Sequence, residues 1–194
     1  MATTTHDWAS TVDADHLVAI RARAQDLAPS GALHLLLEVL AYAADEASVC
    51  GRGSCRVTLH RDCSVSVADD GRGTDTRFDE RGQPVKRPVM STPDVSFFEA
   101  SDPPLLPEGD PRRGMSVVAA FSAWLLHGNR RSDGAWTQRY RYGVPDTDLR
   151  PSRPTTAPVP RSTSCLDRSV RPCCEVGVVL TDWRDLAVEL TDAR

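Results

Sequence analysis

The spacing of apolar residues predicts two helices in the first quarter of the chain. Across residues 15–27, apolar side chains recur at three- and four-residue steps, as they do on one face of a helix. Pro29 ends this helix, and Ser30 is placed to cap the next one. Residues 32–47 carry one broad apolar stripe, which predicts a longer amphipathic helix.

Alternation of apolar and polar residues predicts a β-hairpin after these helices. Residues 56–60 alternate, turn at Arg61 and Asp62, and return through Val65 and Val67. The remaining expected elements are a second amphipathic helix at 114–126, strands at 127–132, 136–142 and 174–181, and a closing helix at 183–190.

Three segments lack such periodicity. Residues 1–12 are polar and are expected to form a disordered tail. Prolines recur through residues 74–113, which predicts a functional lid or loop region or a disordered one. Residues 144–163 are rich in Pro, Ser, Thr and Arg and are expected to be a mobile excursion. Residues 13–194 are therefore predicted to form a single domain.

Composition narrows the class of protein. The chain has 194 residues, of which 40% are hydrophobic and 26% charged, which suits one globular domain. With 23 Lys and Arg against 27 Asp and Glu, the net charge is -4, so direct DNA binding is not expected. The start of the chain lacks a signal-peptide pattern and no run reaches about 18 apolar residues, so we expect a cytoplasmic protein without membrane contact.

The 6 cysteines are expected to be reduced thiols, as is usual outside small secreted proteins. Cys50, Cys55 and Cys63 lie near one another in the sequence. A zinc site there is not favoured, because no CxxC pair occurs among them.

A strand that ends in a carboxylate pair and a glycine turn is the most informative motif. Residues 65–73 read Val-Ser-Val-Ala-Asp-Asp-Gly-Arg-Gly, with Thr-Asp behind them. Such a strand would deliver an acceptor, Asp69, to the mouth of a pocket. Turns of this kind are common after strands, so the motif alone also fits a plain strand-to-loop turn.

The order of three motifs carries a resemblance to a known family. Residues 33–47, the strand and glycine turn at 65–73, and residues 114–122 together resemble the ATPase domain of the DNA gyrase B subunit, of the GHKL class shared with MutL and histidine kinases. The resemblance covers residues 14–185 and implies an α+β fold. In this GHKL (Bergerat) ATPase type, a two-layer α/β sandwich, helices cover one face of a mixed sheet. The nucleotide cleft would lie between the helices and the lid.

The resemblance implies an adenine site at the glycine turn. Asp69 stands at the position of the aspartate that accepts a hydrogen bond from the adenine amino group. Gly71 and Gly73 would leave room for the base, for want of a Cβ, and Arg72 would lie over the base edge.

The resemblance also implies an ion pair beside the nucleotide pocket. Glu46 and Arg131 fall on the positions whose ion pair borders the ATP and coumarin-antibiotic pocket of the family.

The catalytic part of the pattern is incomplete. Glu38, Tyr42 and Asp45 fall at i, i+4 and i+7 and share one edge of their helix. The resemblance gives Glu38 the role of activating the attacking water. Tyr42 stands where the family has a magnesium-binding asparagine, and a neutral phenol is a poor ligand for Mg²⁺, so no metal site is expected there. His34 is expected to be an ordinary surface or edge histidine.

The phosphate-binding loop departs most from the family. Of its glycines only the outer two, Gly109 and Gly114, are present. Pro111 removes a backbone N–H from the loop, whose amides would cradle phosphates. Arg112 and Arg113 are candidates to replace them as phosphate ligands, and otherwise would form a solvated surface pair.

The expected function is a degenerate, stand-alone gyrase-B-like module, a pseudo-ATPase. It would bind ATP or ADP weakly and without need of magnesium, hydrolyse it slowly or not at all, and act in regulation or on a partner protein. One alternative is an active ATPase of the topoisomerase B-subunit type, with Glu38 as general base. A second is a protein-binding scaffold or gyrase decoy. Since the sequence stops before any transducer or DNA-cleaving domain, a complete topoisomerase is not expected.

Overall fold

The computed structural model describes residues 12–73, 80–82, 90–94, 96–98, 100–131, 134–152, 162–166 and 183–194. Residues 1–11 of the tail expected to be disordered, the strand expected at 174–181 and most of the first half of the lid region lie outside the described residues. No helix in the described part of the chain combines the length and apolar character needed to cross a membrane.

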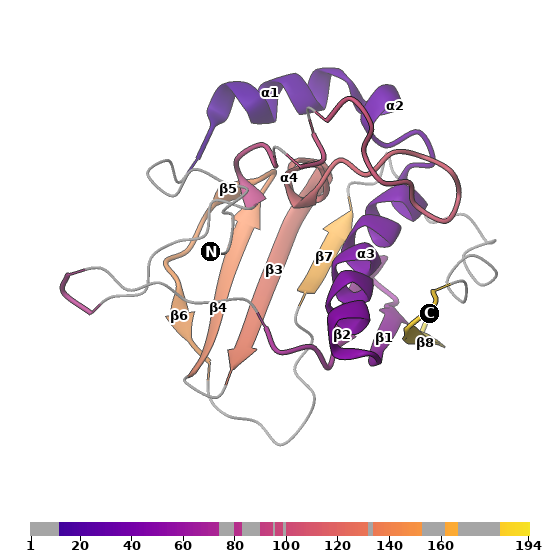
Figure 1. Ribbon diagram of the computed structural model, residues 1–194. Coiled ribbons are helices and arrows are strands. Elements are labelled where there is room, and N and C mark those ends of the chain that lie inside the picture. Colours follow the sequence, from indigo (N-terminus) through magenta and orange to yellow (C-terminus); the bar gives the residue numbers. More distant parts are fainter. Residues whose placement is uncertain are drawn as a thin grey trace.

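The strands form one mixed sheet (Figure 1) with the order β5-β4-β3-β7-β2-β1-β8, and β6 pairs with β4. The described strand pairs are antiparallel except for β1 and β8, which run parallel. The strands are β1 (Gly53–Leu59), β2 (Ser64–Asp69), β3 (Ser122–Arg131), β4 (Gly134–Arg141), β5 (Val144–Pro145), β6 (Arg150–Pro151), β7 (Ser162–Leu166) and β8 (Leu186–Asp192).

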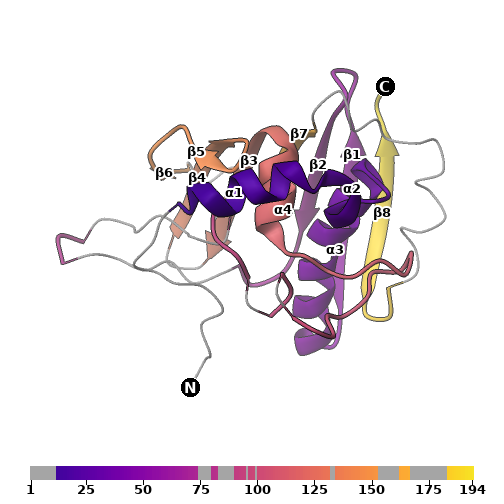
Figure 2. The same cartoon turned by 90° about the horizontal axis from the view of Figure 1, so that it is seen from above.

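The helices gather on one face of this sheet (Figures 1 and 2). They are α1 (Ala14–Ala22), α2 (Ala24–Leu27), α3 (Ala32–Cys50) and α4 (Met115–Phe121). The apolar stripe of α3 packs on β1, β2 and β8, where Leu37, Leu40 and Val57 are fully buried. A second core cluster joins α1 and α4 to β3 and β4, and includes the buried side chains of Leu17 and Tyr140. The mixed α/β architecture expected from the sequence is observed.

Local patterns predicted the central elements correctly. The helix expected at 32–47 is α3, which continues to Cys50, and the expected hairpin is β1 with β2. The strands expected at 127–132 and 136–142 are β3 and β4, which pair antiparallel.

Tertiary contacts changed several other elements. The helix expected at 15–27 is interrupted at Arg23, between α1 and α2. The helix expected at 114–126 ends at Phe121, because the next residue, Ser122, begins a strand that pairs with both β4 and β7. The helix expected at 183–190 is wrong: Leu186–Asp192 is strand β8, paired in parallel with β1.

Two smaller features concern the segment 144–163 and the start of α3. The described part of the segment contains the short strands β5 and β6, which pair with β4, and the start of β7, while residues 153–161 lie outside the described residues, so the expected mobility stays a prediction. Ser30 does not cap α3, whose N-cap residue is Gly31. The Ser30 hydroxyl instead donates to Asp110 Oδ2 at 2.9 Å, which ties the start of α3 to the loop before α4.

Candidate functional site

The two carboxylates at the end of β2 have different partners. Asp69 Oδ1 accepts the N–H of Gly71 at 2.9 Å, which shapes the glycine turn. Asp70 turns toward β1, where its two oxygens accept the N–H and the hydroxyl of Ser54, each at 2.8 Å. Asp70 therefore holds the hairpin together, while Asp69, the predicted adenine acceptor, lies at the mouth of the turn.

Arg72 is the observed partner of Glu46. Its Nε lies 2.5 Å from Glu46 Oε1 and its NH2 lies 3.1 Å from Oε2, a bidentate pair between the glycine turn and α3. The hydrogen bond from Arg72 lowers the pKa of Glu46 to about 2. Arg131 donates to the carbonyl of Gly73 at 3.4 Å on the other side of the turn. The ion pair between Glu46 and Arg131 stays a prediction, and the sequence did not indicate Arg72 as the partner of Glu46.

Gly73 is required by packing within the chain. Its φ is +75°, and a Cβ there would lie 2.5 Å from the carbonyl oxygen of Arg130 and 2.8 Å from Asn129 Oδ1. The missing side chain thus lets the turn approach β3. The room for a base that the sequence suggested at this glycine stays a prediction, while the contact with β3 is a separate reason for the missing Cβ.

Glu38 projects from α3 into the protein and is fully buried. Its Oε1 accepts the backbone N–H of Arg113, and the guanidinium Nε of Arg112 lies 4.0 Å from its Oε2. His34, one turn earlier, places its Nε2 3.7 Å from Oε1. Burial raises the pKa of Glu38, although the N–H of Arg113 and the charges of His34 and Arg112 act in the opposite direction.

Tyr42 fills the space beside the start of α4. Its hydroxyl donates to Asp94 Oδ2 at 3.4 Å, and a Cβ on Gly114 would lie 3.4 Å from the phenol oxygen. Burial raises the pKa of Tyr42, and the carboxylates of Asp94 and Glu38 add to the effect. The neutral phenol of Tyr42 therefore stands at the position of the asparagine that would bind magnesium in the family that the sequence resembles.

Arg112 joins the three residues that share one edge of α3. Its NH1 lies 2.7 Å from Asp45 Oδ2, its Nε is the group near Glu38, and its Cζ lies 5.0 Å from the ring centroid of Tyr42. The ring of Phe97 covers it at 4.1 Å. With a side chain only 5% exposed, Arg112 is not the solvated surface residue that the sequence offered as an alternative.

Sequence comparison supports the resemblance on which these roles rest. No family model matches the chain. Individual curated proteins do match it. The chain is similar to the DNA gyrase B subunit.

It is 34% identical to that protein from Archaeoglobus fulgidus over 113 residues, and 35% identical to that from Thermotoga maritima over 123 residues. These matches cover 58% and 61% of the chain, but only 18% and 19% of the relatives. The type 2 topoisomerase B subunit of Aquifex aeolicus is 35% identical over 102 residues, which cover 52% of the chain and 13% of that relative. The match thus spans less than a fifth of these relatives.

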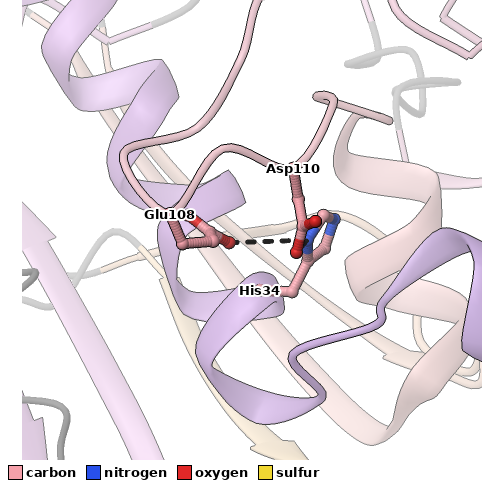
Figure 3. A group of neighbouring side chains, drawn as sticks. All are labelled: His34, Glu108 and Asp110. Atoms are coloured by element: carbon pink, nitrogen blue, oxygen red, sulfur yellow. Dashed lines mark ion pairs between the residues drawn. The ribbon is translucent and has the colours of Figure 1, made fainter.

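A cluster that the gyrase-B-like pattern did not indicate lies one turn before Glu38. Figure 3 shows His34 of α3 facing Glu108 and Asp110, which project from the loop before α4. His34 is 1% exposed, so the expectation of a surface or edge histidine is wrong. The helical stripe placed His34 on α3, but nothing in the sequence indicated that the loop would cover it. Gly109, with φ +94°, lies between the two acidic residues and turns the loop.

Proposed function

We propose that this chain is a gyrase-B-like module that binds an adenine nucleotide weakly, hydrolyses it slowly or not at all, and acts in regulation or in an interaction with a partner protein. The observation that carries the proposal is the environment of Glu38. In the family that the sequence resembles, this position activates water. Here the carboxylate is fully buried and already engaged by backbone and side-chain groups of the loop before α4.

Geometry is the first requirement for a general base, which has to reach the proton that it removes directly or through one water. Glu38 Oε1 accepts the Arg113 N–H, and the Nε of Arg112 forms an ion pair with Oε2 at 4.0 Å without a hydrogen bond. The Arg112 guanidinium is shared with Asp45 and stacked on Phe97. To bind a phosphate, Arg112 would have to break its ion pairs with both Glu38 and Asp45. Arg112 is therefore a weak replacement for the backbone N–H groups that a glycine-rich phosphate loop would provide.

The loop before α4 adds charge of the wrong sign for a triphosphate. Glu108 and Asp110 both lie within 3.7 Å of His34 and flank Gly109, one of the two glycines that match the phosphate loop. Preorganised donors around the transferring phosphate are usually the largest catalytic contribution, and losing one costs about a hundred- to a thousandfold in rate. The arrangement therefore favours binding without turnover.

The end of β2 supports the binding half of the proposal. Asp69 lies beside the turn, and Glu46 with Arg72 borders it. Both partners of the ion pair come from segments that the gyrase-B-like pattern assigns to the nucleotide site. Magnesium would add little, because Tyr42 occupies the ligand position and donates to Asp94.

Calorimetric titration of the full chain with ADP, with and without magnesium, tests the proposal. Asp69→Asn should weaken binding by about 1.5–3 kcal/mol, a factor of roughly 10 to 150, because a charged acceptor is lost. Asp70→Asn is the matched control, since Asp70 is directed at Ser54 and should leave the affinity unchanged. Equal affinities of the parent and Asp69→Asn would refute the adenine assignment.

One observation favours the alternative of an active ATPase. Burial raises the pKa of Glu38, and a carboxylate with a raised pKa is a better general base near neutral pH. The rate of ATP hydrolysis by the parent and by Glu38→Ala distinguishes the two functions. We expect no ATP hydrolysis above background and no effect of Glu38→Ala on the residual rate. Turnover abolished by that substitution would identify an active enzyme, and absence of any nucleotide binding would favour the scaffold.

A further inference from the structure

Three potential metal ligands converge where the loop before α4 covers α3. His34 Nδ1 lies 3.6 Å from Glu108 Oε1 and 3.7 Å from Asp110 Oδ2. The three atoms lie within 4.8 Å of one another (Figure 3). They come from segments more than seventy positions apart, so only the fold brings them together.

The loop is built to present its two carboxylates together. The N–H of Leu106 donates to the carbonyl of Asp110 at 2.8 Å, and the N–H of Gly109 donates back to the carbonyl of Leu106 at 2.8 Å. In this tight turn the side chains of Glu108 and Asp110 both face His34 (Figure 3). The hydroxyl of Ser30 donates to Asp110 Oδ2, which orients that carboxylate toward His34.

The histidine has no hydrogen-bond partner, although it is almost fully buried. His34 is 1% exposed, and neither of its ring nitrogens makes a hydrogen bond. Both oxygens of Glu108 are buried without a partner as well. Buried polar groups without a hydrogen bond are energetically costly and rare in native proteins. We therefore expect a further group to bind to this cluster.

The distances between the ligand atoms show whether a hydrogen bond or a shared metal ion fits the cluster better. A hydrogen bond between an imidazole N–H and a carboxylate needs about 2.7–3.2 Å, and 3.6 Å is too long. In a tetrahedral zinc site with bonds of about 2.0–2.2 Å, neighbouring ligand atoms lie about 3.3–3.6 Å apart. The separations from His34 Nδ1, 3.6 Å to Glu108 and 3.7 Å to Asp110, lie at the upper limit of that range and just above it. A dication would also neutralise two carboxylates that otherwise repel each other.

We propose that His34 Nδ1, Glu108 and Asp110 bind a zinc ion that holds the loop before α4 on α3. Imidazole and carboxylate ligands suit Zn²⁺, and three protein ligands leave a fourth position for solvent on the side of Asp110, whose side chain is 28% exposed. Glu38 Oε1 lies 3.7 Å from His34 Nε2, so its negative charge lies near the ring nitrogen that would not bind the metal. The site does not depend on nucleotide binding.

Zinc titration of the full chain, after treatment with a chelator and with a chromophoric competitor, tests the site. We expect one zinc ion per chain at the site, with affinity reduced more than about tenfold by Glu108→Gln and by Asp110→Asn. Asp102→Asn, which removes an exposed carboxylate from the same loop region, is the matched control and should leave zinc affinity unchanged. Zinc should raise the Tm of the parent and of this control, but not of the two ligand variants.

Two further measurements separate this site from misfolding and from zinc binding to thiols. Circular dichroism without metal should show that the ligand variants are folded, because each removes a repulsive carboxylate. Substitution with Co²⁺ should give visible bands without thiolate charge transfer, since Cys50 and Cys63 are exposed free thiols that could also bind metal. Zinc affinity that is the same in Glu108→Gln and Asp110→Asn as in the parent, or a thiolate band, would overturn the proposal.

Discussion

The buried pair of Arg112 and Glu38 leads to the sharpest prediction for stability. Two unit charges 4.0 Å apart interact by about 4 kcal/mol at an effective dielectric constant of about 20. The contact of Arg112 with Asp45 adds only about 0–1 kcal/mol, because the Asp45 side chain is 59% exposed. Stacking on Phe97 contributes about 1–2 kcal/mol more. Burying the guanidinium itself costs free energy that offsets part of these contributions, so Arg112→Met should lower the free energy of unfolding at pH 7 by about 3–5 kcal/mol, the usual cost of leaving a buried charge unpaired.

Urea unfolding followed by circular dichroism, with a chelator present, measures this loss. In a Glu38→Gln background the same substitution should cost only about 1–2 kcal/mol, so that the two changes are strongly coupled. The penalty should also shrink as the pH falls, because the raised pKa of Glu38 lets its carboxyl take up a proton at a higher pH than an ordinary glutamate does.

Arg56→Met is the matched control for this experiment. Arg56 pairs with Glu189 at 3.0 Å, but the two side chains are 51% and 65% exposed, so the loss should stay below about 1 kcal/mol. If Arg112→Met costs no more than this control, or if its cost simply adds to that of Glu38→Gln, Arg112 does not compensate the buried carboxylate.

Three further predictions concern the turn, the ion pair and the metal position. Gly73→Ala should lower the free energy of unfolding, measured in urea, by about 2–4 kcal/mol, because of the positive φ at Gly73 and its close contact with β3. Gly51→Ala is the control and should cost about 1 kcal/mol, since its φ is +78° but nothing lies within 4 Å of its Cβ position. Equal costs of the two substitutions would contradict the close approach of Gly73 to β3. The pKa of Glu46, lowered from 4.5 to about 2, contributes stability that is present above pH 4.5 and lost as the pH falls toward 2. Because Arg72 is 65% exposed, that contribution is about 1 kcal/mol, and Arg72→Met should abolish it in an acid titration of stability; an unchanged profile would exclude the pair. Nucleotide affinity should be insensitive to magnesium in the parent and in Tyr42→Phe but become dependent on it in Tyr42→Asn, measured by calorimetry; strong dependence in the parent would show that another oxygen binds the metal.

Some features follow from local sequence alone. The stripe of α3 needs only its own 3.6-residue period, and the β1–β2 hairpin needs only alternation and a turn, so both were predicted. The spacing of Glu38, Tyr42 and Asp45 likewise put them on one edge of α3, and Arg112 contacts all three. The order of these motifs also indicated the gyrase-B-like resemblance that the sequence matches support.

Other features depend on partners distant in the chain. Leu186–Asp192 became a strand because β1 offered it an edge, and the helical pattern from residue 114 ended early because β3 gained two neighbouring strands. A short apolar segment is compatible with either structure, so hydrogen-bond partners decide which one forms.

The candidate sites show the same division between sequence and structure. The sequence placed Asp69 at the end of a strand and Glu38 on a helix, since both positions follow from local periodicity. Only the tertiary structure paired Arg72 with Glu46, and only it brought Glu108 to His34. Burial and charge contacts between distant segments depend on how loops cross the helices, and a loop without periodicity does not reveal its path in the sequence.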